Sequence, residues 1–125
     1  MVNYTAGLND DEEPGALNES FADIFGEMSE FEALGSNNYI VLNDVYPTNN
    51  GKRSFSNPKA YPNKYFDGSP NTYHGQYWYY KDTSYGGYHV NGQVQNYWFY
   101  LLAEGGSGVN DNGLAYTIQG LGKDK

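Results

Sequence analysis

The 125-residue sequence contains no cysteine, few basic side chains and no long hydrophobic run. Without cysteine it has no disulfide, no thiol nucleophile and no thiolate ligand for zinc. Seven Lys and Arg against fifteen Asp and Glu give a net charge of −8, and residues 10–32 hold nine acidic residues with no Lys or Arg. We therefore expect neither nucleic acid nor an anionic membrane as partner. No run of about 18 apolar residues is long enough to span a membrane, and the first residues lack the basic and apolar regions of a signal peptide.

Glycine and tyrosine are abundant, with 16 and 14 residues, which indicates a loop-rich chain stabilised by aromatic packing. The strongest periodicity predicts a helix over about 14–34, ended by a glycine C-cap at Gly35. Its apolar stripe consists of Leu17, Phe21, Ile24, Met28 and Phe31, with Phe25 beside them. The opposite, acidic side carries Glu19, Asp23, Glu27 and Glu30.

The remaining sequence predicts one more principal helix and little regular structure. Residues 35–90 contain closely spaced turn signals, with a short strand expected at 39–42. A second helix is expected at about 91–104, stopped by Gly105 and Gly106. A polar loop over 107–113 and a weak extended segment over 114–120 follow. We therefore predict a mainly α fold with long irregular loops, two principal helices and few short strands.

Glu19 and Asp23 lie four residues apart, so a helix places both carboxylates on one face. Spacing alone favours a solvated acidic face. The functional alternative is a zinc ligand, which suits a carboxylate when the other ligands are imidazoles, together with a second carboxylate that orients another ligand. The spacing does not decide between these two interpretations.

Residues 15–19 read Gly-Ala-Leu-Asn-Glu, and Asp23 follows four residues after Glu19. This motif resembles the segment that follows the His-Glu-x-x-His helix in the thermolysin family of zinc metallopeptidases. The resemblance implies that Glu19 is the third zinc ligand and that Asp23 hydrogen-bonds a zinc-binding histidine. Together the matching motifs cover most of this chain but only the middle of a family catalytic domain.

Two further motifs extend the resemblance. Residues 52–58, Lys-Arg-Ser-Phe-Ser-Asn-Pro, are similar to the family's Leu-Arg-Ser-Met-x-Asp-Pro, whose arginine lines the pocket beyond the scissile bond and contacts the substrate carbonyl. Arg53 takes that catalytic role by resemblance. Residues 86–92, Gly-Gly-Tyr-His-Val-Asn-Gly, resemble Gly-Gly-Val-His-x-Asn-Ser, whose histidine donates a hydrogen bond to the oxyanion. His89 matches that histidine. Each residue alone would be read as an ordinary loop side chain, and His74 matches no motif.

The sequence departs from the family pattern at three places. The His-Glu-x-x-His motif, with two zinc ligands and the general base, is absent. Asp10 stands where the family has a tyrosine that contacts the transition state. Ser84 stands where the family has an aspartate that orients the histidine matched by His89, and Asp82 is a nearby candidate to replace that aspartate. Without the ligand pair and the base, we expect no tightly held zinc and no proteolytic activity from this chain alone. By the same resemblance, residues 36–44 with Glu30 cover the region where family members bind calcium through oxygen ligands. Amides replace several of the expected carboxylates here. Both a retained calcium site and an ordinary turn remain open interpretations.

The leading hypothesis is a single partial metallopeptidase domain over 1–125, truncated at both ends, from a secreted zinc endopeptidase that hydrolyses peptides or proteins. The chain would be a truncated piece, a gene fragment or a degenerate descendant of such an enzyme, and the missing catalytic half is a candidate partner; the sequence does not decide among these. The alternative is a non-catalytic sugar- or peptide-binding module built on the aromatic tract at 73–88. A third possibility is a poorly folded chain, because the apolar stripe of the first helix needs a partner.

Overall fold

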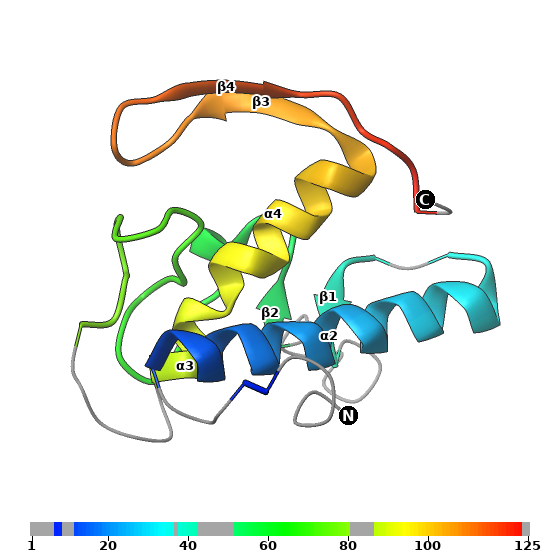
Figure 1. The fold of residues 1–125 in the computed structure, drawn as a ribbon, viewed down its shortest axis with the longest axis horizontal. Coiled ribbons are helices and arrows are strands. Elements are labelled where there is room, and N and C mark those ends of the chain that lie inside the picture. The colour runs from blue at the N-terminus through cyan, green and yellow to red at the C-terminus, as the bar shows by residue number, and fades with distance from the viewer. Residues whose placement is uncertain (1–6, 9–11, 37, 43–51, 81–86, 124–125) are drawn as a thin grey trace.

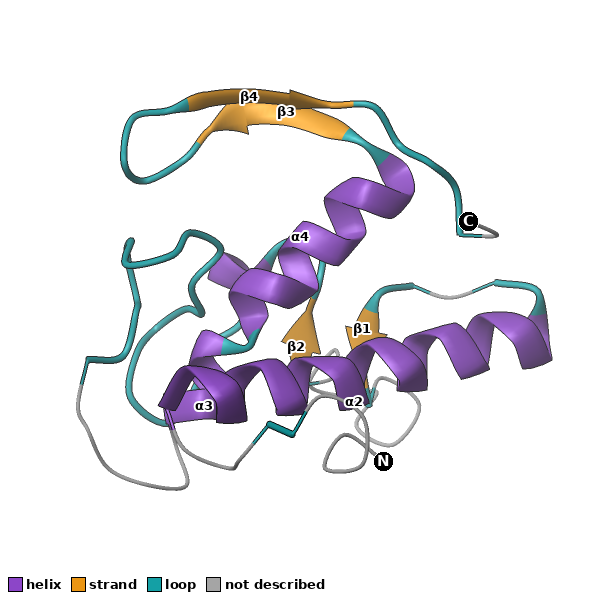
Figure 2. Ribbon diagram, viewed as in Figure 1, coloured by secondary structure: helices purple, strands orange, loops and turns teal. Residues whose placement is uncertain are grey.

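The computed structural model describes residues 7–8, 12–36, 38–42, 52–80 and 87–123. Helix α2 (Glu12–Leu34) forms the base of the molecule, and α4 (Gln93–Glu104) rises away from it (Figure 1). Figure 2 shows the elements by type. The smaller elements are β1 (Ile40–Val41), β2 (Arg53–Ser54), the 3-10 turn η2 (Pro58–Ala60), α3 (Gly87–Asn91), β3 (Gly106–Val109) and β4 (Ala115–Ile118). The predicted mainly α fold with short strands is confirmed.

Both principal helices end at the predicted glycines. The Gly35 N–H donates to the carbonyl of Phe31 at 2.8 Å, with a φ of 73° at Gly35. The Gly105 N–H donates to the carbonyl of Leu101 at 2.8 Å, with a φ of 82°. Glycine adopts these left-handed conformations without the strain that a Cβ would add. The helix expected at about 91–104 is α4, and the short helix α3, which the sequence did not predict, precedes it and is separated from it by Gly92.

Gly92 packs closely against the backbone of α2. A Cβ at this position would lie 2.9 Å from the carbonyl oxygen of Ala16 and 3.0 Å from that of Tyr88. Both are backbone atoms, which cannot swing aside as a long side chain can. The absence of a side chain at Gly92 therefore allows the α3–α4 junction to pack directly on the first turns of α2.

The buried face of α2 matches the predicted apolar stripe only in part. Ile24 is buried and Met28 packs against the core, as predicted, but Leu17 is 41% and Phe25 58% exposed, whereas the small Ala16 and Ser20 are buried. Small side chains at 16 and 20 face the close approach at Gly92, and this contact turns the helix away from the orientation that its larger apolar residues suggest. The prediction that Glu27 lies on a solvent-facing side is wrong: Glu27 is only 4% exposed.

The hydrophobic core lies between α2, the β1–β2 pair and α4. Ile24, Tyr39, Phe55 and Ala103 form it, with Met28, Val41, Phe99 and Tyr100 packed around them. Phe55 is fully buried and meets Phe99 edge to face, and Tyr39 meets Tyr100 in the same way. Strands β1 and β2 are antiparallel and pair Val41 with Arg53. Residue 53 is therefore fixed beside α2 by both the strand pairing and the neighbouring Phe55.

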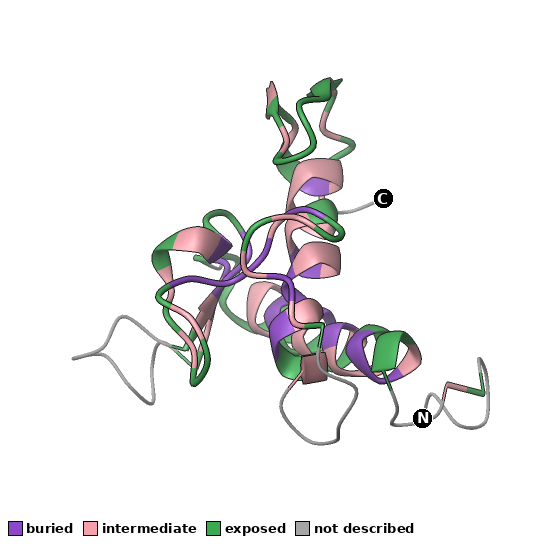
Figure 3. Ribbon diagram, turned by 90° about the vertical axis from the view of Figure 1, so that its left-hand side faces the viewer, coloured by how far each residue is buried: buried purple, intermediate pink, exposed green. Residues whose placement is uncertain are grey.

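The β3–β4 hairpin stands apart from this core. In Figure 3 it projects above the rest of the molecule and carries mostly exposed and intermediate residues. Strand β4 confirms the extended segment expected over 114–120, but β3 falls where the sequence predicted a polar loop to begin. Gly106, Ser107 and Gly108 supply no alternation of apolar and polar side chains, which is the signal that marks a strand.

Candidate functional site

Asp23 and Arg53 form the central pair of the candidate site. Arg53 Nε donates to Asp23 Oδ2 at 2.8 Å, and Arg53 Nη2 donates to Asp23 Oδ1 at 2.6 Å. The planar guanidinium thus meets the carboxylate with two parallel hydrogen bonds, the strongest geometry for this pair of groups. The Asp23 side chain is 11% exposed and the Arg53 side chain 25%. Asp23 therefore does not simply face water, as a solvated helix face would require.

Two buried polar residues that the sequence interpretation missed complete the surroundings of Asp23. Asn96 Nδ2 donates to Asp23 Oδ2 at 2.9 Å. Ser20 Oγ donates to Asn96 Oδ1 at 2.6 Å, and neither Ser20 nor Asn96 is exposed at all. The serine fixes which end of the Asn96 amide faces the aspartate, because its hydroxyl donates to the amide oxygen. Sequence spacing gives no signal for this contact, which joins α2 to α4 across 76 positions.

Glu19 and His89 form a second pair beside the first. His89 Nδ1 lies 3.1 Å from Glu19 Oε2, and the two side chains are 45% and 37% exposed. Glu19 is one turn before Asp23 on α2, and His89 lies on the short helix α3. The structure therefore brings the four predicted site residues together as two neighbouring pairs. His74 is elsewhere, exposed and 4.0 Å from Glu13.

A pocket of about 430 Å³ includes Arg53 and His89 in its wall. It extends from β2 and α3 to the loop over 62–69, and the other lining residues are Lys52, Pro62, Asn63, Lys64, Tyr65, Ser69 and Val90. Its volume falls in the range of sites for small ligands or single peptide side chains. The two residues for which the sequence predicts contact with a substrate thus share one concave surface.

The described part of the chain does not contain a complete metal site. Within it, no group of three or more His, Asp or Glu side chains is placed to hold a metal ion. Glu19 and His89 alone give too few ligands for a structural or catalytic zinc, which takes at least three from the protein. The donor set therefore does not fit zinc on its own. Asp10, Asp82, Ser84 and residues 37 and 43–44 of the expected calcium loop lie outside the described residues, and that calcium site stays a prediction.

Glu27 is the most perturbed carboxyl group close to the site. Its pKa is raised from 4.5 to about 7, first by burial and then by the negative charges of Glu30 and Asp23. The group lies one turn after Asp23 on the same helix. Near neutral pH its ionised form is consequently costly in the folded chain.

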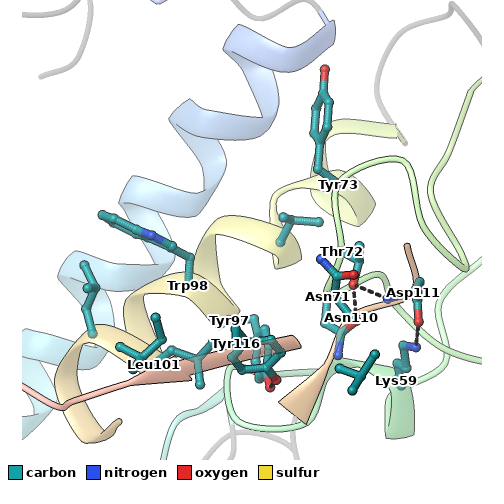
Figure 4. A pocket seen from close by; sticks show the side chains of 14 residues that line it. Lys59, Asn71, Thr72, Tyr73, Tyr97, Trp98, Leu101, Asn110, Asp111 and Tyr116 are labelled. Atoms are coloured by element: carbon teal, nitrogen blue, oxygen red, sulfur yellow. Dashed lines mark hydrogen bonds and ion pairs between the residues drawn. The ribbon is translucent and has the colours of Figure 1, made fainter. Parts of the chain in front are cut away.

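A second cavity, of about 300 Å³, lies between α4, the β3–β4 hairpin and the loop that follows η2 (Figure 4). Tyr97 and Tyr116 meet in its wall with their hydroxyl oxygens 2.7 Å apart, and Lys59 pairs with Asp111 at its edge. In Figure 4 the Tyr73 ring points away from these tyrosines. Within the described part of the 73–88 tract, Trp78 is buried against Tyr73 and His74, so the tract serves at least partly in packing.

The described residues include no helix long and apolar enough to cross a membrane.

Comparison with known proteins identifies relatives over the whole chain. Residues 6–125 match the family model described as thermolysin metallopeptidase, alpha-helical domain. The thermostable neutral protease NprT of Geobacillus stearothermophilus is 34% identical over 128 residues, which cover 100% of this chain and 21% of that protein. Bacillolysin of Brevibacillus brevis is 40% identical over 122 residues, covering 94% and 21%. Neutral protease B of Bacillus subtilis is 36% identical over 119 residues, covering 91% and 20%.

This chain therefore spans about a fifth of the length of the curated relatives it matches. The family match covers nearly every residue and agrees with the mainly α architecture. The chain belongs to the thermolysin metallopeptidase family and corresponds to its alpha-helical domain.

Proposed function

We propose that this chain supplies one side of the active site of a secreted zinc metalloendopeptidase that cleaves peptide bonds in proteins. The observation that carries the proposal is the gathering of Glu19, Asp23, Arg53 and His89 into two adjacent pairs, with Arg53 and His89 on one pocket. These residues come from three separate elements and are the ones for which the motifs imply catalytic or ligand roles. A solvated acidic helix face would not need them to meet.

Each residue has a distinct role in this proposal. Arg53 is oriented by its two hydrogen bonds to Asp23. The N–H groups of Arg53 that do not bond Asp23 can donate to a substrate carbonyl at the pocket. His89 donates to the oxyanion that forms when the carbonyl is attacked. The contact between His89 Nδ1 and Glu19 Oε2 has to open before both residues can act as proposed, one on the oxyanion and the other as a metal ligand.

Zinc enters the proposal only through Glu19. The described residues do not make a zinc site by themselves, so a His-Glu-x-x-His helix outside this sequence would supply the other ligands and the general base. Asp23 would then position one of those histidines as well as Arg53. For the chain alone we expect no cleavage of casein, and cleavage that a chelator abolishes would contradict this expectation.

The experiment that tests the proposal is a chimera. The chain replaces the matching fifth of the Brevibacillus brevis bacillolysin, which provides the rest of a protease of this family. We expect the chimera to bind zinc and cleave casein, and Glu19→Gln to abolish both. Glu32→Gln makes the same chemical change at an exposed position of α2 and serves as the matched control. A chimera that keeps its zinc and its activity with Glu19→Gln would refute the proposed role.

A second candidate function is the aromatic binding module. Tyr73 and Tyr80 remain 52% and 68% exposed, and such rings can stack on a sugar or a peptide. Calorimetric titration of the chain with soluble glycans and peptides tests this function. If the chain binds one of these ligands, if Tyr80→Ala abolishes the binding and if a metal chelator does not affect it, the result would favour the binding module over the peptidase.

A further inference from the structure

A third pocket, of about 270 Å³, lies between the first turns of α2, the start of α4 and the loop over 73–78. Both tryptophans of the chain, Trp78 and Trp98, line it together with Tyr73. The other lining residues are Glu13, Ala16, Leu17, Asn91, Gly92, Val94 and Gln95. Tyr73, Val94 and Trp98 also border the cavity shown in Figure 4. None of the four residues of the proposed peptidase site is in the wall of this third pocket.

Three aromatic rings give this pocket its character. The ring centroids of Tyr73 and Trp78 lie 4.9 Å apart and their planes meet at 68°, so the two rings form a corner. His74 stacks on the Tyr73 ring at 4.2 Å and 13°, which supports that ring from outside the pocket wall. Tyr73 and Trp98 are 52% and 57% exposed, whereas Trp78 is buried. Ring surface in this pocket is therefore open to a ligand that arrives from solvent.

The loop that carries two of these rings is held in an uncommon backbone conformation. His74 and Tyr77 have φ values of 54° and 67°, in the left-handed region that residues with a Cβ rarely adopt. The backbone N–H of Gln76 donates to Asp111 Oδ2 at 2.9 Å, which ties the loop to the turn of the β3–β4 hairpin. Such strain persists only where the surroundings fix it. Rings on a fixed loop lose little freedom when a ligand binds, so the pocket is partly preorganised.

Glu13 brings a negative charge to these rings. Its Oε1 accepts a hydrogen bond from the Tyr73 hydroxyl at 2.6 Å, and its side chain is 55% exposed. A hydroxyl group orients the carboxylate but does not neutralise it. His74 Nε2 lies 4.0 Å from the same oxygen and offsets the charge only when it is protonated. Among the described residues no Lys or Arg pairs with Glu13, in contrast to Asp111, which pairs with Lys59.

The two amides in the wall also suit a cation. Asn91 is occupied by the backbone of Tyr79, whose N–H donates to Asn91 Oδ1 at 2.9 Å and whose carbonyl accepts from Asn91 Nδ2 at 3.0 Å. Gln95 Oε1 is buried and accepts no hydrogen bond from the described residues. The carboxylate, this amide oxygen and the faces of the aromatic rings all carry negative charge or partial negative charge. A positively charged group is the ligand that this combination attracts.

We propose that this pocket binds an alkylammonium cation. Tyr73, Trp78 and Trp98 would form the aromatic cage, and Glu13 would supply the counter-charge. Quaternary ammonium groups suit such cages because their methyl groups pack on the rings while the charge is attracted to the ring faces. The cation belongs either to a free small molecule or to a methylated lysine of a peptide. The inference does not rest on the proposed peptidase activity, because the two sites share no residue.

The direct test compares two probes of the same shape. Choline and 3,3-dimethylbutan-1-ol differ in that a carbon replaces the nitrogen, so only choline is charged. Both tryptophans of the chain line the pocket, and their fluorescence reports its occupancy. We expect choline to bind about two- to thirtyfold tighter than the alcohol. Sodium chloride at the same concentration controls for ionic strength. Equal affinities, or neither a fluorescence change nor heat of binding beyond those of sodium chloride, overturn the inference.

Substitutions at exposed positions assign the binding to this pocket. Trp98→Leu removes one ring and should weaken choline at least about twofold, measured by calorimetry. Phe25→Leu removes an exposed ring outside the pocket and should leave the affinity unchanged. Glu13→Gln should reduce the preference for choline over the alcohol, and Glu32→Gln, at an exposed position of the same helix, should not. Choline binding that is unchanged in both Trp98→Leu and Glu13→Gln overturns the assignment. The comparison of probes on the parent chain needs no variant, so a variant that fails to fold leaves it intact.

Peptides separate the two sources of the cation. Two peptides that are acetylated and amidated at their ends differ only by trimethyllysine or leucine at one position. Tighter binding of the trimethyllysine peptide than of choline supports a peptide side chain as the ligand, and the reverse order supports a small molecule. A preference for the leucine peptide, or for a soluble glycan, over choline overturns the ammonium site and assigns the pocket to an apolar or sugar ligand. A chimera that cleaves nothing refutes the proposed peptidase function and leaves these comparisons unaffected.

Discussion

Glu27→Gln should stabilise the folded chain at neutral pH. Glu27 is 4% exposed on α2, and burial, with the charges of Glu30 and Asp23, raises its pKa from 4.5 to about 7. In the unfolded chain the same group ionises near its ordinary value. The glutamine has nearly the same shape and carries no charge at any pH, so the substitution isolates the cost of ionising this group.

The sign and size of the effect follow from the shift. A carboxyl group with a raised pKa contributes stability below its unfolded value of 4.5, and this contribution is lost as the pH rises through about 7. A difference of roughly 2.5 pKa units corresponds to about 3 kcal/mol. Glu27→Gln should therefore change the unfolding free energy little near pH 4 and raise it by about 3 kcal/mol above pH 7.

The assay is urea denaturation followed by far-ultraviolet circular dichroism at a series of pH values. The parent chain should lose stability between about pH 4.5 and 7 relative to Glu27→Gln. Glu32→Gln, at an exposed position of the same helix, provides the control for removing one negative charge. A difference between parent and Glu27→Gln that stays constant with pH, or that matches Glu32→Gln, would refute a buried carboxyl group with a raised pKa.

Two further substitutions test the packing that positions the site. Asn96→Leu removes the amide between Ser20 and Asp23 and should lower the unfolding free energy by about 2–4 kcal/mol, because both partners lose a hydrogen bond in the interior. Denaturation midpoints measure this loss. A loss no larger than that of a substitution at an exposed position would contradict the hydrogen-bond network. Gly92→Ala places a Cβ 2.9 Å from the carbonyl oxygen of Ala16 and should cost about 1–3 kcal/mol. Thermal unfolding detects this cost, and an unchanged midpoint would show that the two backbones are not in close contact.

Local patterns predicted the helices well because their signals are local. The spacing of apolar residues and the glycines at 35 and 105 define the ends of α2 and α4 in the sequence itself. The buried face of α2 was predicted only in part, because its first turns pack against a residue that is distant in the sequence. Gly92 admits the small side chains of Ala16 and Ser20, and the larger Leu17 is left partly exposed. Periodicity ranks residues by apolar size and carries no information about such an approach.

For the candidate site too, the sequence predicted part of what the structure shows. Motif resemblance selected Glu19, Asp23, Arg53 and His89, and the structure brings them together. The bidentate pairing of Asp23 with Arg53 joins positions 30 residues apart, and the contact of Asn96 with Asp23 joins positions 73 apart. These contacts are set by how α2, β2 and α4 pack. A single sequence therefore identifies candidate residues, whereas the hydrogen bonds that orient them become visible only in three dimensions.

The central claim is that Glu19 belongs to the metal centre of a peptidase completed by residues outside this chain. The most direct measurement is the zinc content and casein hydrolysis of the chimera with the Brevibacillus brevis bacillolysin, compared between Glu19→Gln and Glu32→Gln. We predict that Glu19→Gln loses both zinc and activity while Glu32→Gln retains both. Full zinc content and full activity in Glu19→Gln would contradict the account.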